Sequence, residues 1–217
     1  MTWAGDLIWQ PSLLDAGPEP VVDESFGGAV RIALDGRSWI ERVPGFVAHS
    51  DALFDHLVST VDWGQRTRRM WENRVLEPRL TAWWGAGSGR PLEPPVLETM
   101  RRVLSARYGV EFDSMGLNLY RDGRDSVAWH GDRIAREIAE PLVAIVSIGE
   151  PRRFLLRPKA AVDGKRRVRR LLLGRGELLV TGGATQRAWE HSVPKVAAAG
   201  PRMSLTFRHG PLVPLPS

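Results

Sequence analysis

The chain contains no cysteine, and this absence removes several kinds of chemistry at once. Disulfide bonds, thiolate metal sites and cysteine nucleophiles are all excluded. Long apolar runs are missing too, since no stretch approaches the roughly 18 apolar residues of a membrane-spanning helix. The first residues also lack the basic start and continuous apolar core of a secretory signal. These absences predict a cytoplasmic protein that does not associate with a membrane.

Lysine is scarce, with three among the 30 basic residues, so the basic character of the chain comes from 27 arginines. The net charge is +5 and the sequence pI is about 10.3, which favours polyanionic partners. Nine tryptophans suit either core packing or a platform on which bases stack, and composition does not choose between the two. The 217 residues, 43% of them hydrophobic, predict a single domain with a sizeable core over residues 29–217.

The first half of the chain is predicted to hold an irregular arm and two helices. Residues 1–28 are rich in proline, glycine and acidic side chains and are predicted to be the arm. Apolar spacing predicts a helix over residues 49–63, with Ser50 as its N-cap. Residues 64–78 are basic and predicted to be irregular, and a short strand follows in "RLTAWW". A second helix is predicted over residues 94–109, between a proline pair and a glycine.

After Met115 the pattern changes to short runs rich in valine, leucine and isoleucine, separated by glycine or proline. Examples are "GLNLY", "PLVAIVSIG", "RRFLLRP" and "GELLVTGG". Such runs are typical of an antiparallel sandwich or barrel. The predicted class is therefore α+β, mainly β, with the helices packed outside the sheets. The basic run "KRRVRR" is predicted to lie in a hairpin with solvated charges, with phosphate contact as the alternative.

The stretch "SVAWHGDRI" places His130 and Asp132 two residues apart after a strand-like run. Side chains two apart on a strand share a face, so this pair suits a divalent metal ion. A third ligand is found in "QRAWEHSVPK", where His191 follows a separate strand, whereas His49 and His56 are predicted to be surface or structural residues. Two histidines and one carboxylate form the facial triad of non-haem Fe(II) oxygenases, which leaves metal positions open.

The C-terminal run "PRMSLTFRHG" carries Arg202, Thr206 and Arg208 on one face of a predicted strand. Two cations on one face of an apolar sandwich are costly unless an anion lies against them. An arginine fork matches a carboxylate in bidentate fashion. In "GLNLY", Asn118 and Tyr120 share a face in the same way. These residues predict a pocket with a metal at one end and a dicarboxylate at the other.

In that order and spacing, "NLY", "HGD", "HSVPK" and "RMSLTFR" resemble the AlkB family of Fe(II)/2-oxoglutarate-dependent dioxygenases, over roughly residues 40–210. The resemblance implies a double-stranded β-helix, or jelly-roll, core. It also implies Fe(II) and 2-oxoglutarate as cofactors, with O2 as co-substrate. The implied reaction is oxidative removal of alkyl groups from nucleic-acid bases of the 1-methyladenine or 3-methylcytosine type, releasing formaldehyde, succinate and CO2.

The resemblance also implies residue roles, position by position. The residues that match the iron ligands are His130, Asp132 and His191. The residues that match those binding the far carboxylate of 2-oxoglutarate are Asn118, Tyr120 and Arg202. The rest of that C-terminal cofactor motif is matched by Thr206 and Arg208.

The sequence departs from the family where the substrate is recognised. Acidic residues that help to recognise the base usually follow the H-x-D motif, and here the chain has Arg133 and Ile134. The loop that fills the gap left by a flipped base is shortened to "AGSGRPLEPP". Substrate contacts are therefore predicted for Trp71, Trp83, Trp84 and Arg133, with single-stranded DNA preferred over duplex, RNA as an alternative, and a monomeric enzyme. Two other readings are an oxygenase acting on a protein or small molecule, and a nucleic-acid-binding module with a vestigial metal site, which the intact ligand set argues against.

Overall fold

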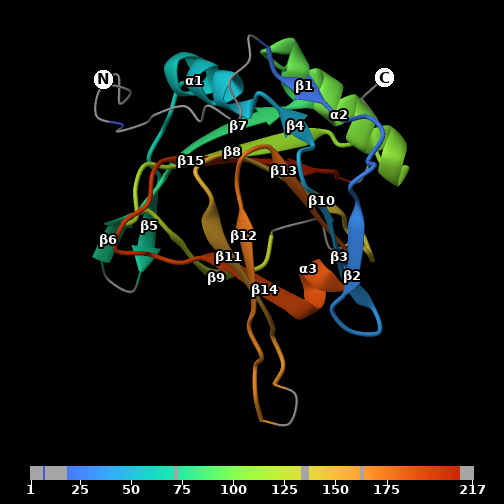
Figure 1. Cartoon of the computed structure of the whole chain (residues 1–217). Helices are drawn as coiled ribbons and strands as arrows, with labels where there is room; N and C mark the ends of the chain where they lie inside the picture. Colours follow the sequence, from blue (N-terminus) through green and yellow to red (C-terminus); the bar gives the residue numbers. More distant parts are fainter. Residues whose placement is uncertain (1–6, 8–18, 71–72, 133–136, 162–163, 211–217) are drawn as a thin grey trace.

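A computed structural model describes residue 7 and residues 19–70, 73–132, 137–161 and 164–210. Two antiparallel sheets lie face to face, and two helices cover the outer side of the larger sheet (Figure 1). This is the predicted mainly β, jelly-roll architecture with helices outside it. Among the described residues the longest helix has 14 residues, and none has the length and apolar character needed to cross a membrane.

The larger sheet has seven strands in the order β2-β3-β13-β10-β15-β8-β7. Their bounds are Val30–Ala33 (β2), Ser38–Val43 (β3), Glu177–Gly183 (β13), Val143–Gly149 (β10), Arg202–Arg208 (β15), Ser114–Tyr120 (β8) and Leu80–Gly85 (β7). The smaller sheet has four strands in the order β12-β11-β14-β9. Their bounds are Arg169–Leu173 (β12), Arg152–Pro158 (β11), Trp189–Val193 (β14) and Val127–His130 (β9).

The central strand β10 explains why its sequence is a continuous apolar run. Every residue of β10 is buried. Ala144, Val146 and Ile148 pack into the core beneath the helices, whereas Val143 and Ile145 pack between the two sheets. Side chains alternate along a strand, so a strand that is covered on both faces has no position left for a polar residue to meet water.

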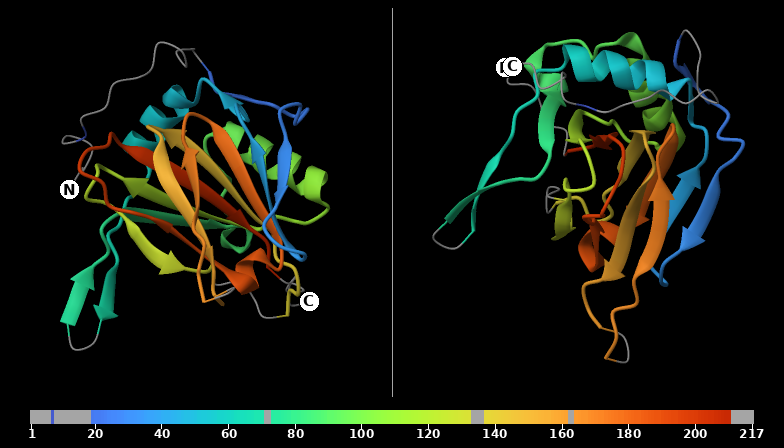
Figure 2. Two further views of the ribbon diagram at one scale, coloured as in Figure 1. Left: turned by 60° about the horizontal axis from the view of Figure 1, so that its bottom comes forward. Right: turned by 60° about the vertical axis from the view of Figure 1, so that its left-hand side comes forward.

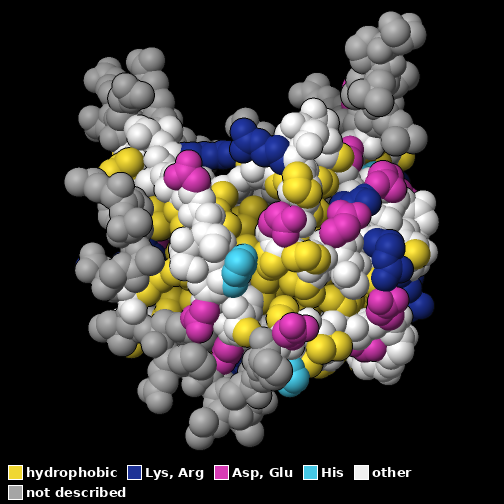
Figure 3. All heavy atoms as spheres, turned by 90° about the horizontal axis from the view of Figure 1, so that it is seen from above, with side chains coloured by type: hydrophobic (Ala, Val, Ile, Leu, Met, Phe, Trp, Pro, Cys, Tyr) yellow, Lys and Arg dark blue, Asp and Glu magenta, His cyan; other side chains and the backbone are white. Residues whose placement is uncertain are grey.

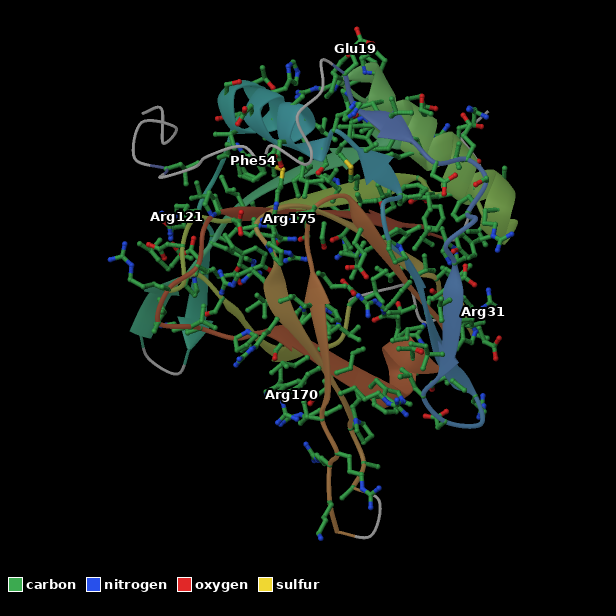
Figure 4. All side chains as sticks on the ribbon, viewed as in Figure 1. Glu19, Arg31, Phe54, Arg121, Arg170 and Arg175 are labelled. Carbon is green, nitrogen blue, oxygen red and sulfur yellow. The ribbon has the colours of Figure 1, made fainter. Side chains whose placement is uncertain are left out.

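The helices α1 (Ser50–Thr60) and α2 (Pro95–Tyr108) lie where the sequence predicted them. Phe54, labelled in Figure 4, lies between α1 and the seven-stranded sheet and belongs to the buried core. The prediction of Ser50 as N-cap was wrong by one residue, because His49 is the cap and has left-handed backbone angles (φ 55°). The second helix ends as predicted at Gly109, whose φ of 66° places it in the region that favours glycine.

Two segments that we expected to be irregular contain strands. Residues 64–78 hold β5 (Thr67–Met70) and β6 (Asn73–Leu76), an antiparallel hairpin that stands away from the sandwich (Figure 2). In the described part of the predicted arm, β1 (Val21–Val22) pairs with β4 (Val47–Ala48), and Phe26 enters the core. The boundary of the arm at residue 28 stays a prediction.

The strand β3, with the sequence "SWIERV", was not among the predicted elements, and it carries two charged residues. It pairs along its whole length with β13. Glu41 is 3% exposed and accepts hydrogen bonds from Tyr108 Oη (2.6 Å) and Arg31 Nε (2.9 Å). A buried carboxylate is tolerated where its charge is paired and hydrogen-bonded. The strand β13 and Tyr108 are distant in sequence, so the local sequence does not indicate them, whereas Arg31 lies on the neighbouring strand β2.

The basic run at residues 165–170 leads into β12 of the β11–β12 hairpin, as predicted, and is largely exposed, with Arg170 (labelled in Figure 4) on β12. On the opposite, helix-covered side, acidic and apolar side chains lie together near the centre of the face (Figure 3). Lys and Arg side chains also lie on this face, toward its edges (Figure 3).

Candidate active site

The inner face of the seven-stranded sheet carries polar side chains because β15 alternates strictly. Its apolar residues Met203, Leu205 and Phe207 join the core beneath the helices. The residues between them therefore face the smaller sheet, and they are Arg202, Ser204, Thr206 and Arg208. One strand thus separates a hydrophobic core from a charged cavity.

The neighbouring strand β8 repeats this pattern in register with β15. Tyr120 pairs with Arg202, Asn118 with Ser204 and Gly116 with Thr206. The residue at position 116 must be small, because a Cβ there would lie 2.9 Å from Nη1 of Arg208. The two strands therefore bring the predicted cofactor residues together on one surface.

The smaller sheet supplies the histidines. His191 on β14 and His130 on β9 are direct cross-strand partners, with ring centroids 4.3 Å apart. His191 also stacks on the Phe154 ring at 5.2 Å and is 8% exposed. Asp132 follows two residues after His130, so the pairing of β9 with β14 brings all three predicted ligands to one place.

The carboxylate of Asp132 is divided between two partners. Its Oδ1 accepts hydrogen bonds from Nε and Nη2 of Arg208. Its Oδ2 is buried, has no hydrogen-bond partner among the described residues, and lies 3.7 Å from Nε2 of His191. Burial raises the pKa of Asp132, but the surrounding charges and hydrogen bonds, those of Arg208 foremost, together outweigh burial and hold that pKa below its usual value. The side chain is therefore an anion with one oxygen unused.

Both histidines are suited to bind a metal ion. Burial lowers the pKa of His191 to about 4, so its imidazole is neutral at pH 7 and keeps a lone pair. Nδ1 of His130 lies 2.8 Å from the carbonyl oxygen of Ala128, which leaves Nε2 for a metal. Among the described residues, no three His, Asp or Glu side chains lie close enough together to coordinate one metal ion without some rearrangement. Two imidazoles and one carboxylate are suitable ligands for a divalent metal ion, and they do not surround it completely.

At the other end of the site, Arg202 is a buried cation with unused hydrogen-bonding capacity. It is 1% exposed. Its Nη2 donates to Oγ of Ser147 (2.6 Å), and its guanidinium lies 5.4 Å from the Tyr120 ring centroid. Nε and Nη1 have no partner among the described residues. Burial lowers the pKa of Arg202, but arginine still stays charged at pH 7. These groups fit a carboxylate.

A single cavity of about 600 Å³ joins the two ends. All eight residues that were predicted to bind iron or 2-oxoglutarate line it, namely Asn118, Tyr120, His130, Asp132, His191, Arg202, Thr206 and Arg208. Their assignment to particular ligands stays a prediction, but the structure brings them together as the sequence pattern required.

Of the described residues predicted to contact the substrate, one lines the cavity and another does not. Trp83 is 57% exposed and lines the cavity beside Gly116, its partner on β8. Trp84 does not line this cavity: as the next residue on β7 it packs against the helix-side core, and its indole N–H donates to the Arg90 carbonyl (2.8 Å), so a substrate contact for it stays a prediction. Trp71 and Arg133 lie outside the described residues.

The sequence analysis did not identify Gln186, which accepts a hydrogen bond from the backbone of Asp132. It lies in the short helix α3 (Thr185–Ala188) and is 4% exposed. Its Oε1 accepts from the backbone N–H of Asp132 (3.3 Å), and its Nε2 donates to Oγ1 of Thr181 (2.7 Å). Only the fold joins these positions, since 54 residues separate Gln186 from Asp132.

Two further cavity residues, Glu77 and Arg79, also escaped the sequence analysis. Nη2 of Arg79 lies 2.9 Å from Oε2 of Glu77. Nε of Arg79 donates to Oδ1 of Asn118 (3.0 Å), which is one of the predicted cofactor residues. Both side chains come from the segment between β6 and β7, where Glu77 fell in the predicted irregular stretch and Arg79 at the start of the predicted strand "RLTAWW".

Comparison with known proteins agrees with this site. The profile of the 2OG-Fe(II) oxygenase superfamily matches residues 86–208. A solved structure of OsALKBH1 superposes with a TM-score of 0.58 at 16% sequence identity, over 83% of this chain and 100% of that one, which supports the fold. The class defined by fold and site is that of the Fe(II)- and 2-oxoglutarate-dependent oxygenases.

Two sets of relatives identify the family within this class of oxygenases. Alpha-ketoglutarate-dependent dioxygenase alkB homolog 3 from Homo sapiens is 35% identical over 210 residues, covering 88% of this chain and 73% of the relative. DNA oxidative demethylase ALKBH2 from Homo sapiens is 36% identical over 181 residues, covering 74% and 69%. The chain belongs to the AlkB family of dioxygenases, which use Fe(II), 2-oxoglutarate and O2.

Proposed function

We propose that this enzyme oxidatively demethylates N-alkylated bases in nucleic acid, with lesions of the 1-methyladenine and 3-methylcytosine type as substrates. The observation that supports this most is the single cavity, because it joins the predicted iron ligands, the buried Arg202 and the exposed Trp83. One relative is named a DNA oxidative demethylase, and that name describes the same chemistry. The products would be the repaired base, formaldehyde, succinate and CO2.

Each group in the cavity has a separate task in this proposal. His130, Asp132 and His191 would hold Fe(II), and Arg202 with Tyr120 would hold the far carboxylate of 2-oxoglutarate. When bound, these cofactors supply the oxidising power of the reaction. The protein binds, orients and excludes water. Arg208 keeps Asp132 ionised. By donating to Oδ1 it also orients the carboxylate so that Oδ2 faces His191.

We further propose that single-stranded DNA is preferred, with RNA as the alternative, and that the enzyme acts as a monomer. After β7 the chain forms only a three-residue 3-10 turn, Ala86–Ser88, where a longer loop would fill the gap left in a duplex. Trp83 remains to stack on an unpaired base, and such stacking contributes roughly 1–3 kcal/mol per base. Cytoplasmic localisation stays a prediction from composition.

The test combines succinate and formaldehyde release. The enzyme is loaded anaerobically with Fe(II) and 2-oxoglutarate and then exposed to oxygen with matched single-stranded and duplex oligonucleotides that carry 1-methyladenine, with Asp132→Ala as the inactive control. We expect both products in equal amount and faster turnover on the single strand. Faster repair of the duplex would refute the strand preference. Succinate without repair of any methylated oligonucleotide would refute the function and favour a protein or small-molecule substrate.

A further inference from the structure

Two carboxylates are found among the described residues that line the cavity, those of Asp132 and Glu77. Asp132 is already engaged by Arg208 and is a proposed iron ligand. Glu77 has no such task. Its side chain is 16% exposed, and its Oε2 is buried without a hydrogen-bond partner among the described residues. Nη2 of Arg79 lies 2.9 Å from this oxygen, so Glu77 and Arg79 form a salt bridge in the wall of the cavity.

The backbone around Glu77 is fixed on both sides. Its N–H donates to the carbonyl of Arg66 (2.8 Å), which closes the base of the β5–β6 hairpin. Its own carbonyl accepts from Nε2 of Gln65 (2.9 Å) and from the N–H of Arg79 (2.8 Å). These three contacts fix the backbone at Glu77, and the salt bridge to Arg79 orients its carboxylate, which recognition of a substrate requires.

We propose that Glu77 is the residue that selects cationic methylated bases, an inference that rests on the proposed function. N-methylation gives 1-methyladenine and 3-methylcytosine a positive charge, and each keeps an exocyclic amine that donates hydrogen bonds. 3-Methylthymine is neutral and has no such amine. A carboxylate both attracts the charge and accepts from the amine, and hydrogen bonds with an ionised partner are the stronger kind.

The sequence gives an independent reason to look for this group. Arg133 and Ile134 occupy the positions after the H-x-D motif where acidic residues would be expected to meet the base. Neither side chain can accept a hydrogen bond from an exocyclic amine. Glu77 supplies, from a different segment, the negative charge that those two positions lack.

A second explanation of Glu77 must be separated from this one. Glu77 pairs with Arg79, and Arg79 donates to Asn118, so Glu77 could act only by orienting the binding site of 2-oxoglutarate. In that case, Glu77→Gln and Arg79→Met would weaken 2-oxoglutarate in the same way and would affect all methylated bases equally. Selectivity between bases therefore distinguishes recognition from orientation.

The experiment measures that selectivity in wild type, Glu77→Gln, Glu77→Asp and Arg79→Met. Dissociation constants are measured anaerobically with Mn(II) and 2-oxoglutarate, for single-stranded oligonucleotides that carry 1-methyladenine or 3-methylthymine, and kcat/KM is measured with Fe(II) in air. We expect Glu77→Gln to lower the preference for 1-methyladenine by about tenfold in both measurements. Glu77→Asp keeps the charge and should retain most of the preference, and Arg79→Met should raise the KM for 2-oxoglutarate with the preference unchanged.

The outcomes are distinguishable. If wild type repairs methylated bases and Glu77→Gln leaves the ratio between the two oligonucleotides unchanged, Glu77 does not select the base and only this inference is overturned. The same holds if Arg79→Met changes the ratio as much as Glu77→Gln does. If wild type repairs no methylated base, the proposed function itself fails.

Discussion

Replacing Arg202 is predicted to weaken the binding of 2-oxoglutarate and, at the same time, to stabilise the protein when 2-oxoglutarate is absent. Its guanidinium is 1% exposed, donates one hydrogen bond to Ser147 and leaves two nitrogens without partners among the described residues. Replacement by methionine removes the charge and keeps most of the volume. We expect Arg202→Met to bind 2-oxoglutarate more weakly and, without 2-oxoglutarate, to be more stable than wild type.

The magnitudes follow from the contacts. A hydrogen bond to a charged group contributes roughly 1.5–3 kcal/mol, so losing the carboxylate contact should raise the dissociation constant of 2-oxoglutarate about tenfold to a hundredfold. A buried ion without full compensation costs several kcal/mol after relaxation. The bond to Ser147 offsets part of that cost, which leaves a gain of about 1 kcal/mol or more for the variant. For a chain of this size, each 1 kcal/mol raises Tm by roughly 2–4 °C.

Thermal unfolding with and without 2-oxoglutarate, in the presence of Mn(II) and without oxygen, measures both effects. Wild type should be stabilised by the cofactor, whereas Arg202→Met should begin at a higher Tm and gain little. Arg153→Met, at an exposed position on β11, is the matched control and should behave as wild type. A variant that is less stable than wild type and binds 2-oxoglutarate with unchanged affinity would show that Arg202 is a structural residue.

Three further predictions concern the surroundings of the site and the core. Gln186→Leu removes the acceptor for the backbone N–H of Asp132 and should weaken Mn(II) binding about tenfold to a hundredfold in titration calorimetry, and unchanged binding would refute a supporting role. Burial, together with a hydrogen bond to a carboxylate, raises the pKa of Tyr108, so the unfolded chain ionises first and the stability from this group, present below about pH 10, is lost as the pH rises further. Urea midpoints of wild type should therefore fall more steeply than those of Tyr108→Phe between about pH 9 and about pH 11. Gly182→Ala should cost about 1–3 kcal/mol, because its Cβ would lie 2.1 Å from an indole carbon, whereas Gly36→Ala, with no atom within 4 Å, should change urea stability by less than about 0.5 kcal/mol.

The parts of the site that could be predicted from sequence are those set by strand periodicity. Arg202 and Arg208 are six residues apart, so they share a face of any regular strand, and His130 and Asp132 mark the end of another. The same rule separates Trp83 from Trp84, because neighbours on a strand face opposite sides. That signal was present in the sequence, although substrate contacts were predicted for both tryptophans.

The parts that could not be predicted depend on contacts across the fold. The role of Gln186 is recognised only in the folded chain, where α3 brings its side chain to the backbone of Asp132. The burial of Glu41 on β3 could not be predicted, because it depends on Tyr108, which is distant in sequence, and on the pairing of β3 with β2, which carries Arg31. The β5–β6 hairpin was hidden for a different reason, since its basic residues lack the apolar alternation that indicates a half-buried strand.

The link between Arg208 and Asp132 has a consequence for how damage to the protein would show itself. Arg208 ends β15 in the larger sheet, and Asp132 follows β9 in the smaller one, so the pair spans the sandwich. The position of this ligand is therefore set by the spacing of the two sheets. A substitution in the core between them should loosen the site before it unfolds the chain, and the iron content of purified variants would then report on packing far from the metal.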